Sequence, residues 1–323
     1  MAADTRIITV GLAPAWDITC RGRDIRWGAH QHIDGQTIHP AGKALNVSRA
    51  LAWLGRGSIA AGLWGRNDYQ QMLTAVQSAW PLITVRMSAV AGDTRRNVTI
   101  VDAAKGKEMH LRNRSPLASA AALMQLKTDL GKIVRRGSIC VFAGTMPEGG
   151  LLDRVVRIVD SCASRGARIV LDTSGPALRR IVDAGQVWLI KPNVEELRQL
   201  SGRKIKDEPA SLAAAARGLL DKVEMVLVSR GAKGGLLVSK HGVWQARCVS
   251  RAKVLSTVGC GDYLLAGFLN DFLANSDPGS ALKNAIKVAT ARAWGWTEGN
   301  TCRQALRGAH CGKRKIEVTV ERT

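Results

Sequence analysis

The sequence of 323 residues lacks any apolar run long enough to span a bilayer, and its first residues carry no basic-then-apolar signal peptide. It also lacks a Cys-x-x-Cys pair, and its seven cysteines are odd in number and widely spaced. That pattern argues against a disulfide framework or a zinc site. His310 and Cys311 near Cys302 resemble a metal fragment, but no fourth ligand accompanies them. We therefore expect a cytoplasmic protein with reduced thiols.

Acidic residues are scarce, because 26 Asp and Glu stand against 47 Lys and Arg, for a net charge of +21. Such a balance favours contact with polyanions. The basic residues are spread along the chain, however, and no aromatic residues interleave with the compact run 313–315, as a single-strand binder would need. Nucleic acid is therefore not the expected main partner, and a basic surface also attracts phosphorylated metabolites.

No Pro- or Ser-rich linker and no internal repeat divides the chain. From Ser119 onward, apolar strands alternate with helices, which predicts a parallel sheet covered on both faces. Residues 12–40 and 94–113 lack long helices, so we expect their strands to form a small β-rich lid. We predict one α/β domain over 1–323 with this lid, rather than two domains.

The stretch 257–262, Thr-Val-Gly-Cys-Gly-Asp, reads as a turn that opens an apolar helix. Gly259 and Gly261 allow positive φ and leave room for a ligand against the backbone. Unpaired amides at a helix start hold phosphate, and the Asp262 carboxylate would repel that phosphate. Asp262 is therefore either a base that takes a proton from an attacking hydroxyl or a helix N-cap. The residues alone leave both interpretations open.

A helix ending near Gly55 brings an amide, an ammonium and a carboxamide to its start, from Gly42, Lys43 and Asn46. This combination suits a hydroxylated, anionic ligand. In the alternative interpretation, which the spacing alone slightly favours, Lys43 points to solvent and Asn46 is a polar residue of the helix surface.

Asn193 and Glu196 are three residues apart at the start of another helix, so they share a face. Their oxygens could hold waters around a Mg²⁺ ion on nucleotide phosphates. The same pair fits a capping box, and the two roles are compatible.

These stretches occur in one order with others that carry polar or Gly-rich residues after predicted strands. The motifs lie at Ala13–Asp17, Ala41–Arg49, Thr94–Asn97, Asp172–Gly175, Lys191–Glu196, Ser229–Gly234 and Thr257–Asp262. Together they resemble the ribokinase-like (PfkB) carbohydrate kinases, and most of all the branch of 1-phosphofructokinase and tagatose-6-phosphate kinase. The resemblance implies a three-layer α/β/α fold with a mainly parallel central sheet and a small β-sheet lid. It also implies a homodimer that pairs through the lid.

The resemblance implies transfer of the γ-phosphate of ATP to a hydroxyl of a hexose monophosphate such as fructose 1-phosphate. Asp262 would be the catalytic base, and the amides of Gly259, Cys260 and Gly261 would form an anion hole. The implied sugar-phosphate residues are Asp17, Gly42, Lys43, Asn46 and Arg95. The implied nucleotide residues are Lys191, Asn193, Glu196, Ser229, Gly231 and Gly234, with Asn193 and Glu196 also serving Mg²⁺ through water. Activation by a monovalent cation stays undecided.

Two other functions stay open: a kinase for an unphosphorylated sugar or nucleoside, and a catalytically weak relative that binds nucleic acid or a protein partner. Departures from the family pattern motivate them. Tyr263 follows the base where a small residue is usual, and we expect its ring near the nucleotide or sugar. His110 takes the place of a second cation for the sugar phosphate. Residues 313–323 lie beyond the match and read as a flexible basic tail.

Overall fold

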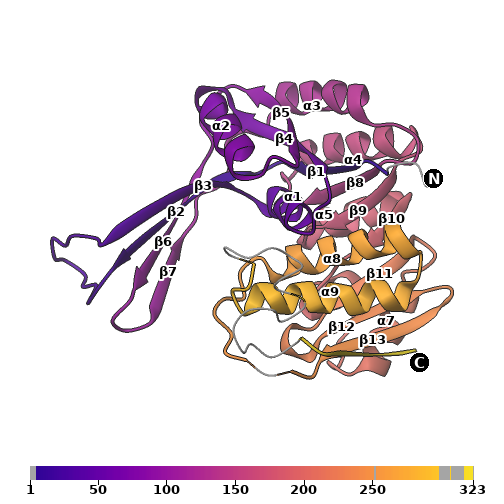
Figure 1. Ribbon diagram of the computed structural model, residues 1–323. Coiled ribbons are helices and arrows are strands. Elements are labelled where there is room, and N and C mark those ends of the chain that lie inside the picture. The colour runs from indigo at the N-terminus through magenta and orange to yellow at the C-terminus, as the bar shows by residue number, and fades with distance from the viewer. Residues whose placement is uncertain (1–4, 251, 298–305, 307–315, 323) are drawn as a thin grey trace.

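The computed structural model describes residues 5–250, 252–297, 306 and 316–322. The body of the molecule is built on a ten-stranded sheet in the order β14-β13-β12-β11-β10-β9-β8-β1-β4-β5 (Figure 1). Its parallel part comprises β1 (Ile7–Gly11), β4 (Ser58–Gly65), β5 (Ile83–Val90), β8 (Ile139–Ala143), β9 (Arg168–Asp172), β10 (Val187–Ile190) and β11 (Val223–Ser229). The antiparallel edge comprises β12 (Gly235–Ser239), β13 (Gly242–Cys248) and β14 (Val318–Arg322).

Helices cover both faces of this sheet, because the strands are apolar on both sides. One apolar layer packs against α3 (Ala120–Ile133), α4 (Gly150–Ala163), α5 (Gly175–Ala184), α6 (Val194–Ser201) and α7 (Pro209–Arg217). The opposite layer packs against α1 (Lys43–Trp53), α8 (Cys260–Asn275) and α9 (Pro278–Ala293), and α2 (Tyr69–Ala79) covers β4 and β5. The predicted fold class, three layers around a mainly parallel sheet, is confirmed.

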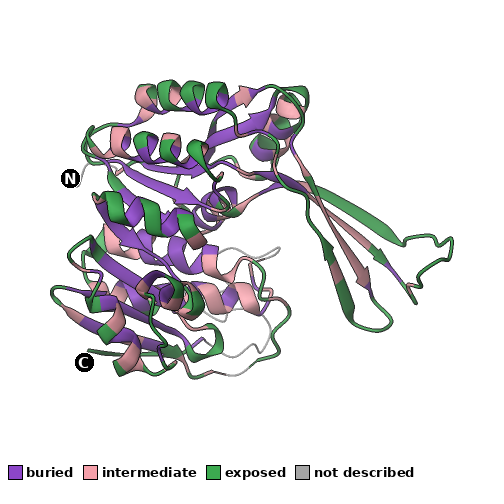
Figure 2. Cartoon of the chain, turned by 180° about the vertical axis from the view of Figure 1, so that it is seen from behind, coloured by how far each residue is buried: buried purple, intermediate pink, exposed green. Residues whose placement is uncertain are grey.

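A second, four-stranded sheet projects from the body as a lid (Figure 1). In the order β3-β2-β6-β7 it contains β3 (Gly35–Ala41), β2 (Ala15–Gly22), β6 (Arg96–Asp102) and β7 (Lys107–Leu111). Its strands have few buried residues beyond the base, and Figure 2 shows exposed and half-buried residues along most of their length. The lid therefore gains little from the body's core.

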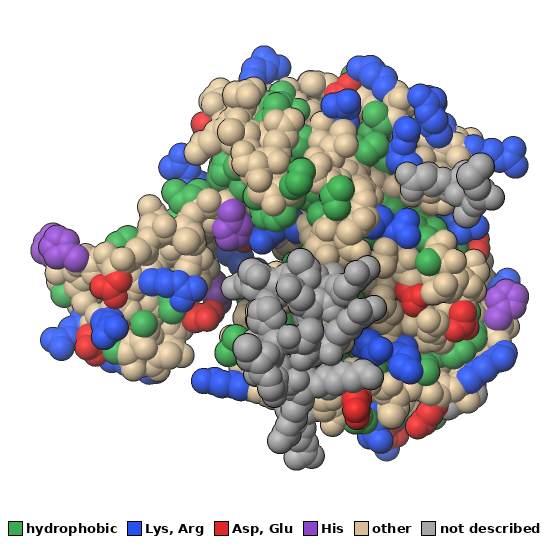
Figure 3. Space-filling view, in the orientation of Figure 1, with side chains coloured by type: hydrophobic (Ala, Val, Ile, Leu, Met, Phe, Trp, Pro, Cys, Tyr) green, Lys and Arg blue, Asp and Glu red, His purple; other side chains and the backbone are tan. Residues whose placement is uncertain are grey.

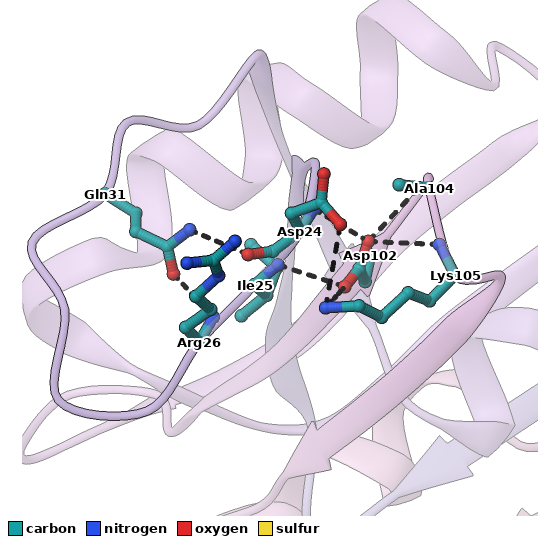
Figure 4. A network of polar contacts seen from close by, with 7 residues as sticks. All are labelled: Asp24, Ile25, Arg26, Gln31, Asp102, Ala104 and Lys105. Carbon is teal, nitrogen blue, oxygen red and sulfur yellow. Dashed lines mark hydrogen bonds and ion pairs between the residues drawn. The ribbon is translucent and has the colours of Figure 1, made fainter.

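The far end of the lid is tied together by the Asp102 carboxylate (Figure 4). It accepts the backbone N–H groups of Asp24 and Ile25 from one loop, at 3.1 and 3.0 Å, and those of Ala104 and Lys105 from the β6–β7 turn. Burial opposes the charge of Asp102, but these hydrogen bonds and the Lys105 side chain lower its pKa. The loop between β2 and β3 is therefore held on the rest of the lid.

The expected basic tail is wrong for residues 316–322. Ile316 is buried, and β14 pairs antiparallel with β13, with Val318 opposite Cys248. Apolar residues at 316, 318 and 320 recur with the period of two that suits a half-buried edge strand. Residues 313–315 lie outside the described part of the chain.

Candidate active site

Four chemistry-bearing segments, far apart in the sequence, meet near the carboxyl ends of the central strands. Lys43 begins α1, Asp172 ends β9, Lys191 follows β10, and Asp262 lies in the first turn of α8. The ammonium groups of Lys43 and Lys191 each lie 3.2 Å from the same oxygen of Asp172, Oδ1. Ligands bind at these strand ends in open α/β sheets, so the cluster marks the candidate site.

Asp262 is 4% exposed, and its Oδ2 accepts a hydrogen bond of 2.9 Å from Nδ2 of Asn46. The N-cap of α8 is Gly259, and no side chain caps this helix. The interpretation of Asp262 as a helix cap is therefore wrong. The structure instead joins its carboxylate to α1, the other helix whose start carries candidate ligands.

Burial raises the pKa of Asp262 to about 7, and the negative charge of Asp172 acts in the same direction. The Asn46 hydrogen bond and the ammonium groups of Lys191 and Lys43 oppose this rise. A carboxyl group with a pKa near the working pH is suited to proton transfer.

The start of α8 supplies backbone N–H groups next to a buried ammonium. Gly259 has a φ of 78°, which favours glycine. A Cβ on Gly261 would lie 3.2 Å from Nζ of Lys191, so the ammonium lies against the backbone of this turn. The N–H of Cys260 makes a 3.3 Å turn hydrogen bond to Thr257, which leaves Gly259 and Gly261 as the stronger candidates for anion donors. Amides, a helix N-terminus and a cation converge here, which favours phosphate.

Asp172 is the residue of the site whose role sequence reasoning missed. It was recognised only as a member of a motif, although it ends a buried strand on the edge where ligands bind. It is 1% exposed, and its Oδ2 has no hydrogen-bond partner among the described residues. Burial opposes its charge, but Lys191 and Lys43 outweigh that effect and lower the pKa of Asp172. The same carboxylate and those of Asp262 and Glu196 outweigh burial at Lys43 and raise its pKa.

The base of the lid adds an acid and an amide to this cluster. Oδ1 of Asp17 on β2 accepts a 2.8 Å hydrogen bond from Nδ2 of Asn97 on β6, its neighbour in the sheet register. Gly42, directly after the last residue of β3, has a φ of 133° and is the N-cap of α1. Figure 3 shows Lys or Arg side chains and a His side chain where the lid meets the body.

Arg95 lies beside this group, but its guanidinium already has partners. It donates to the backbone carbonyls of Ala13, Pro14 and Asn113, at 2.9, 3.2 and 2.6 Å. Three of its five N–H groups are used in this way. Arg95 therefore ties together the loops at the base of the lid, and two N–H groups remain for a ligand.

The predicted nucleotide residues lie on two adjacent loops. Asn193 and Glu196 form the expected capping box, with both hydrogen bonds at 2.8 Å. Asn193 also pairs with Ser229 in an isolated parallel β-bridge, which brings the loop after β11 alongside. Gly231 and Gly234 in that loop both have positive φ. The structure thus brings these five residues to one edge of the sheet.

Residues 5–294 match the sequence model of the pfkB family of carbohydrate kinases. The chain belongs to this family. It is therefore a carbohydrate kinase, a phosphotransferase, as the motifs predicted.

Relatives within the pfkB family cover most of the chain. It is 27% identical over 284 residues to 1-phosphofructokinase of Vibrio cholerae, with 88% of each chain covered. It is 31% identical to 1-phosphofructokinase of Bacillus subtilis, covering 81% of this chain and 84% of the relative. The crystal structure of phosphofructokinase-2 from Escherichia coli in complex with potassium superposes with a TM-score of 0.83 at 25% identity, covering 90% of this chain and 93% of that one.

The structure shows the surroundings of two residues that depart from the pfkB pattern. Tyr263 is 8% exposed and packs into the core, with its ring 6.0 Å from that of Trp53. The ring therefore lies between α8 and α1, and the expectation that it is near the nucleotide or sugar stays a prediction. His110 lies on the exposed β7 strand, where it contacts Thr99 and the Glu108 carboxylate, at 3.1 and 3.3 Å.

No group of three or more His, Cys, Asp or Glu in the described residues could hold a metal ion directly. The fragment at Cys302, His310 and Cys311 lies outside them. None of the described helices has the length and apolar character that a membrane crossing requires.

Proposed function

We propose that this kinase transfers the γ-phosphate of ATP to a hydroxyl of a hexose monophosphate of the fructose 1-phosphate type. The observation that carries the proposal is the buried carboxyl of Asp262 at the start of α8. It accepts a hydrogen bond from Asn46 of α1, and Lys191 lies against Gly261 beside it. The relatives named 1-phosphofructokinase, at 27 to 31% identity, support this acceptor class.

In the proposed reaction, the ionised Asp262 takes the proton of the acceptor hydroxyl. At the same time the hydroxyl oxygen bonds to the γ-phosphorus of ATP, and the bond between that phosphorus and ADP breaks. Asn46 holds the carboxylate in place through its 2.9 Å hydrogen bond. The amides at the start of α8 and the Lys191 ammonium stabilise charge on the transferring phosphoryl group. Catalysis of this kind is mainly positioning and electrostatics.

The sugar phosphate would lie between the lid and α1. Asp17, held by Asn97, would bind sugar hydroxyls, and the amide of Gly42 would approach the ligand closely. Lys43, whose side chain is 43% exposed, and the two remaining N–H groups of Arg95 would contact the phosphate already on the sugar.

ATP would lie along the loops after β10 and β11, on Lys191, Asn193, Glu196, Ser229, Gly231 and Gly234. The residues fit a hydrated Mg²⁺: the capping box uses Oε2 of Glu196 and leaves Oε1 for a bound water, and Oδ2 of Asp172 is a buried oxygen in need of a partner. When bound, Mg²⁺ neutralises charge on the nucleotide phosphates. Because phosphofructokinase-2 from Escherichia coli has been crystallised with potassium, K⁺ is a further candidate cofactor.

A panel of hexoses, hexose monophosphates and nucleosides, each with MgATP and with or without K⁺, tests the function. We expect turnover on a ketohexose monophosphate. The Asp262→Asn variant should lose about 10²-fold or more in kcat, since it removes a general base. Folded protein that turns over no hexose monophosphate would contradict the proposal.

The charge of the acceptor separates this proposal from a kinase for unphosphorylated sugars or nucleosides. Lys43→Met should raise KM for the phosphorylated acceptor by about tenfold or more, because it removes a charge-assisted contact. The same change should leave KM for any unphosphorylated sugar within about twofold. Equal effects on both acceptors would remove Lys43 from phosphate binding.

We also propose that the chain works as a single kinase unit, in the cytoplasm where ATP and sugar phosphates occur, and as a homodimer through the lid. One face of the lid is apolar: Ile18 pairs in register with Ile38 and Val98, and Val98 pairs with Leu111. Ile38 and Leu111 remain 51% and 49% exposed. A sheet face of this kind is suited to packing on a second copy of itself.

A further inference from the structure

Asp68 contacts both lid strands at the point where they leave the body. It ends the short 3₁₀ helix η1 (Arg66–Asp68), between β4 and α2. Its Oδ2 accepts the indole N–H of Trp16, on β2. Its Oδ1 accepts the backbone N–H and the hydroxyl of Thr94, just before β6, at 3.2 and 3.1 Å. One carboxylate of the body thus holds two strands of the lid.

Gly65 completes this network and shows how tightly it is packed. Its N–H donates to the hydroxyl of Thr94 at 2.9 Å. A Cβ on Gly65 would lie 2.5 Å from the backbone nitrogen of Thr94 and 2.7 Å from Oδ1 of Asp68. The φ of Gly65 is −64°, which any residue can adopt, so glycine is needed here for space.

Trp16 carries the other half of the connection. Its ring is 5% exposed and packs edge-on against Trp64 of β4, with centroids 5.6 Å apart. Its backbone N–H donates to the carbonyl of Arg95 at 2.9 Å, which joins β2 to the start of β6. A buried indole N–H without an acceptor is costly, so the Asp68 carboxylate holds Trp16 in this position.

The two residues that Asp68 holds are sequence neighbours of two proposed ligands: Trp16 precedes Asp17, and Thr94 precedes Arg95. We propose that Asp68 is a positioning residue, which sets Asp17 and Arg95 of the lid against Lys43 and the rest of the sugar-phosphate site in the body. This inference rests on the proposed function for its kinetic consequence. The anchoring of the lid itself does not depend on which acceptor is used.

The kinetic test compares Asp68→Ala with Asp93→Ala. Asp93 is an exposed carboxylate of the same region, which accepts from the side chain of Asn67 at 3.2 Å. Asp68→Ala should raise KM for the sugar phosphate about tenfold or more, because small misplacements of positioning groups are costly. KM for ATP should stay within about twofold, since the nucleotide loops lie at β10 and β11. Asp93→Ala should change neither constant.

Two further variants separate positioning from a general loss of structure. Trp16→Phe keeps the ring but removes the N–H, and Thr94→Val removes the hydroxyl. Both should raise KM for the sugar phosphate selectively, each by less than Asp68→Ala does. Unchanged KM for the sugar phosphate in all three variants would overturn the proposal. So would equal rises in both KM values with a lowered melting temperature, which would indicate a structural role only.

Hydrogen–deuterium exchange tests the anchoring without any substrate. In Asp68→Ala, amides of β2 and β6 near the body should exchange at least several-fold faster than in the wild-type protein, while α8 and β10 stay unchanged. Asp93→Ala is again the control. Unchanged exchange in β2 and β6 would overturn the inference. Faster exchange in a protein that turns over no hexose monophosphate would instead contradict the proposed function and leave the anchor standing.

Discussion

In the proposed reaction Asp262 is the base, and its protonation should therefore set the pH range of activity. Because burial raises its pKa to about 7, the carboxylate form needed to accept a proton is lost as the pH falls below that value. We expect kcat/KM to fall about tenfold per pH unit below pH 7 and to level off above it. A pH–rate profile from 5.5 to 9 measures this. A profile that stays flat to pH 5.5 would show that Asp262 is not the base.

The same raised pKa predicts that Asp262 destabilises the folded protein at neutral and alkaline pH. The unfolded chain releases this proton near the ordinary value of 3.8, whereas the folded protein keeps it until about 7. Stability is therefore lost as the pH rises between these values. Asp262→Asn should melt several degrees higher than wild type at pH 8, and the difference should shrink toward pH 4. If Asp262→Asn melts lower than wild type at pH 8, the buried charge of Asp262 does not destabilise the folded protein.

Asp172 holds two ammonium groups with one oxygen, so it should matter to stability as well as to the site. Asp172→Asn would leave the buried Lys191 without its counter-charge, at a cost of about 3–5 kcal/mol of unfolding free energy. The matched control is Asp153→Asn, which breaks an exposed pair with Arg180 and should cost no more than about 1 kcal/mol. Urea unfolding of both variants gives the comparison, and equal effects would contradict it.

At the scale of elements, the loop after β11 is held by close backbone packing. A Cβ on Gly234 would lie 2.1 Å from the carbonyl oxygen of Ala246 on β13, and its φ is 89°. Gly231 has a φ of 56° and open space around it. Gly234→Ala should therefore lower stability by several kcal/mol and raise KM for ATP. Gly231→Ala should cost only about 1–2 kcal/mol. Thermal unfolding and the KM for ATP of both variants test this prediction, and similar effects of Gly234→Ala and Gly231→Ala would contradict it.

Elements with a strong local signal were predictable, and those that depend on a partner were not. The glycines and apolar stripe of residues 257–273 predicted a helix start that the structure has at Cys260. By contrast, the sequence does not predict β14, because its short alternating pattern forms a strand only where it pairs with β13. The local patterns also do not indicate the roles of Asp172 and Asp68, since each depends on donors from other elements, remote in the sequence.

For the whole molecule, the exposed apolar face of the lid predicts the oligomeric state. Ile38→Asp places a charge in the centre of that face and should convert the proposed dimer into monomers. Thr37→Asp is the control, because residue 37 is next to Ile38 in β3 and its side chain lies on the opposite, polar face of the sheet. Sedimentation velocity measures both. A wild-type monomer, or a dimer that survives Ile38→Asp, would exclude pairing through this face.

The sequence by itself determined the family and the alternation of buried strands and helices, and it marked Asp262 and the Gly-rich turns as candidates for the base and the phosphate-binding site. These follow from local patterns: apolar periodicity, glycine where backbone must approach a ligand, and charged residues after strands. Tertiary structure alone decided that Asp262 is buried beside Asp172 and bonded to Asn46, which shifts its pKa. It also decided that Asp68 anchors the lid. Such effects depend on distances between residues remote in the chain, and short-range sequence patterns carry no information about those distances.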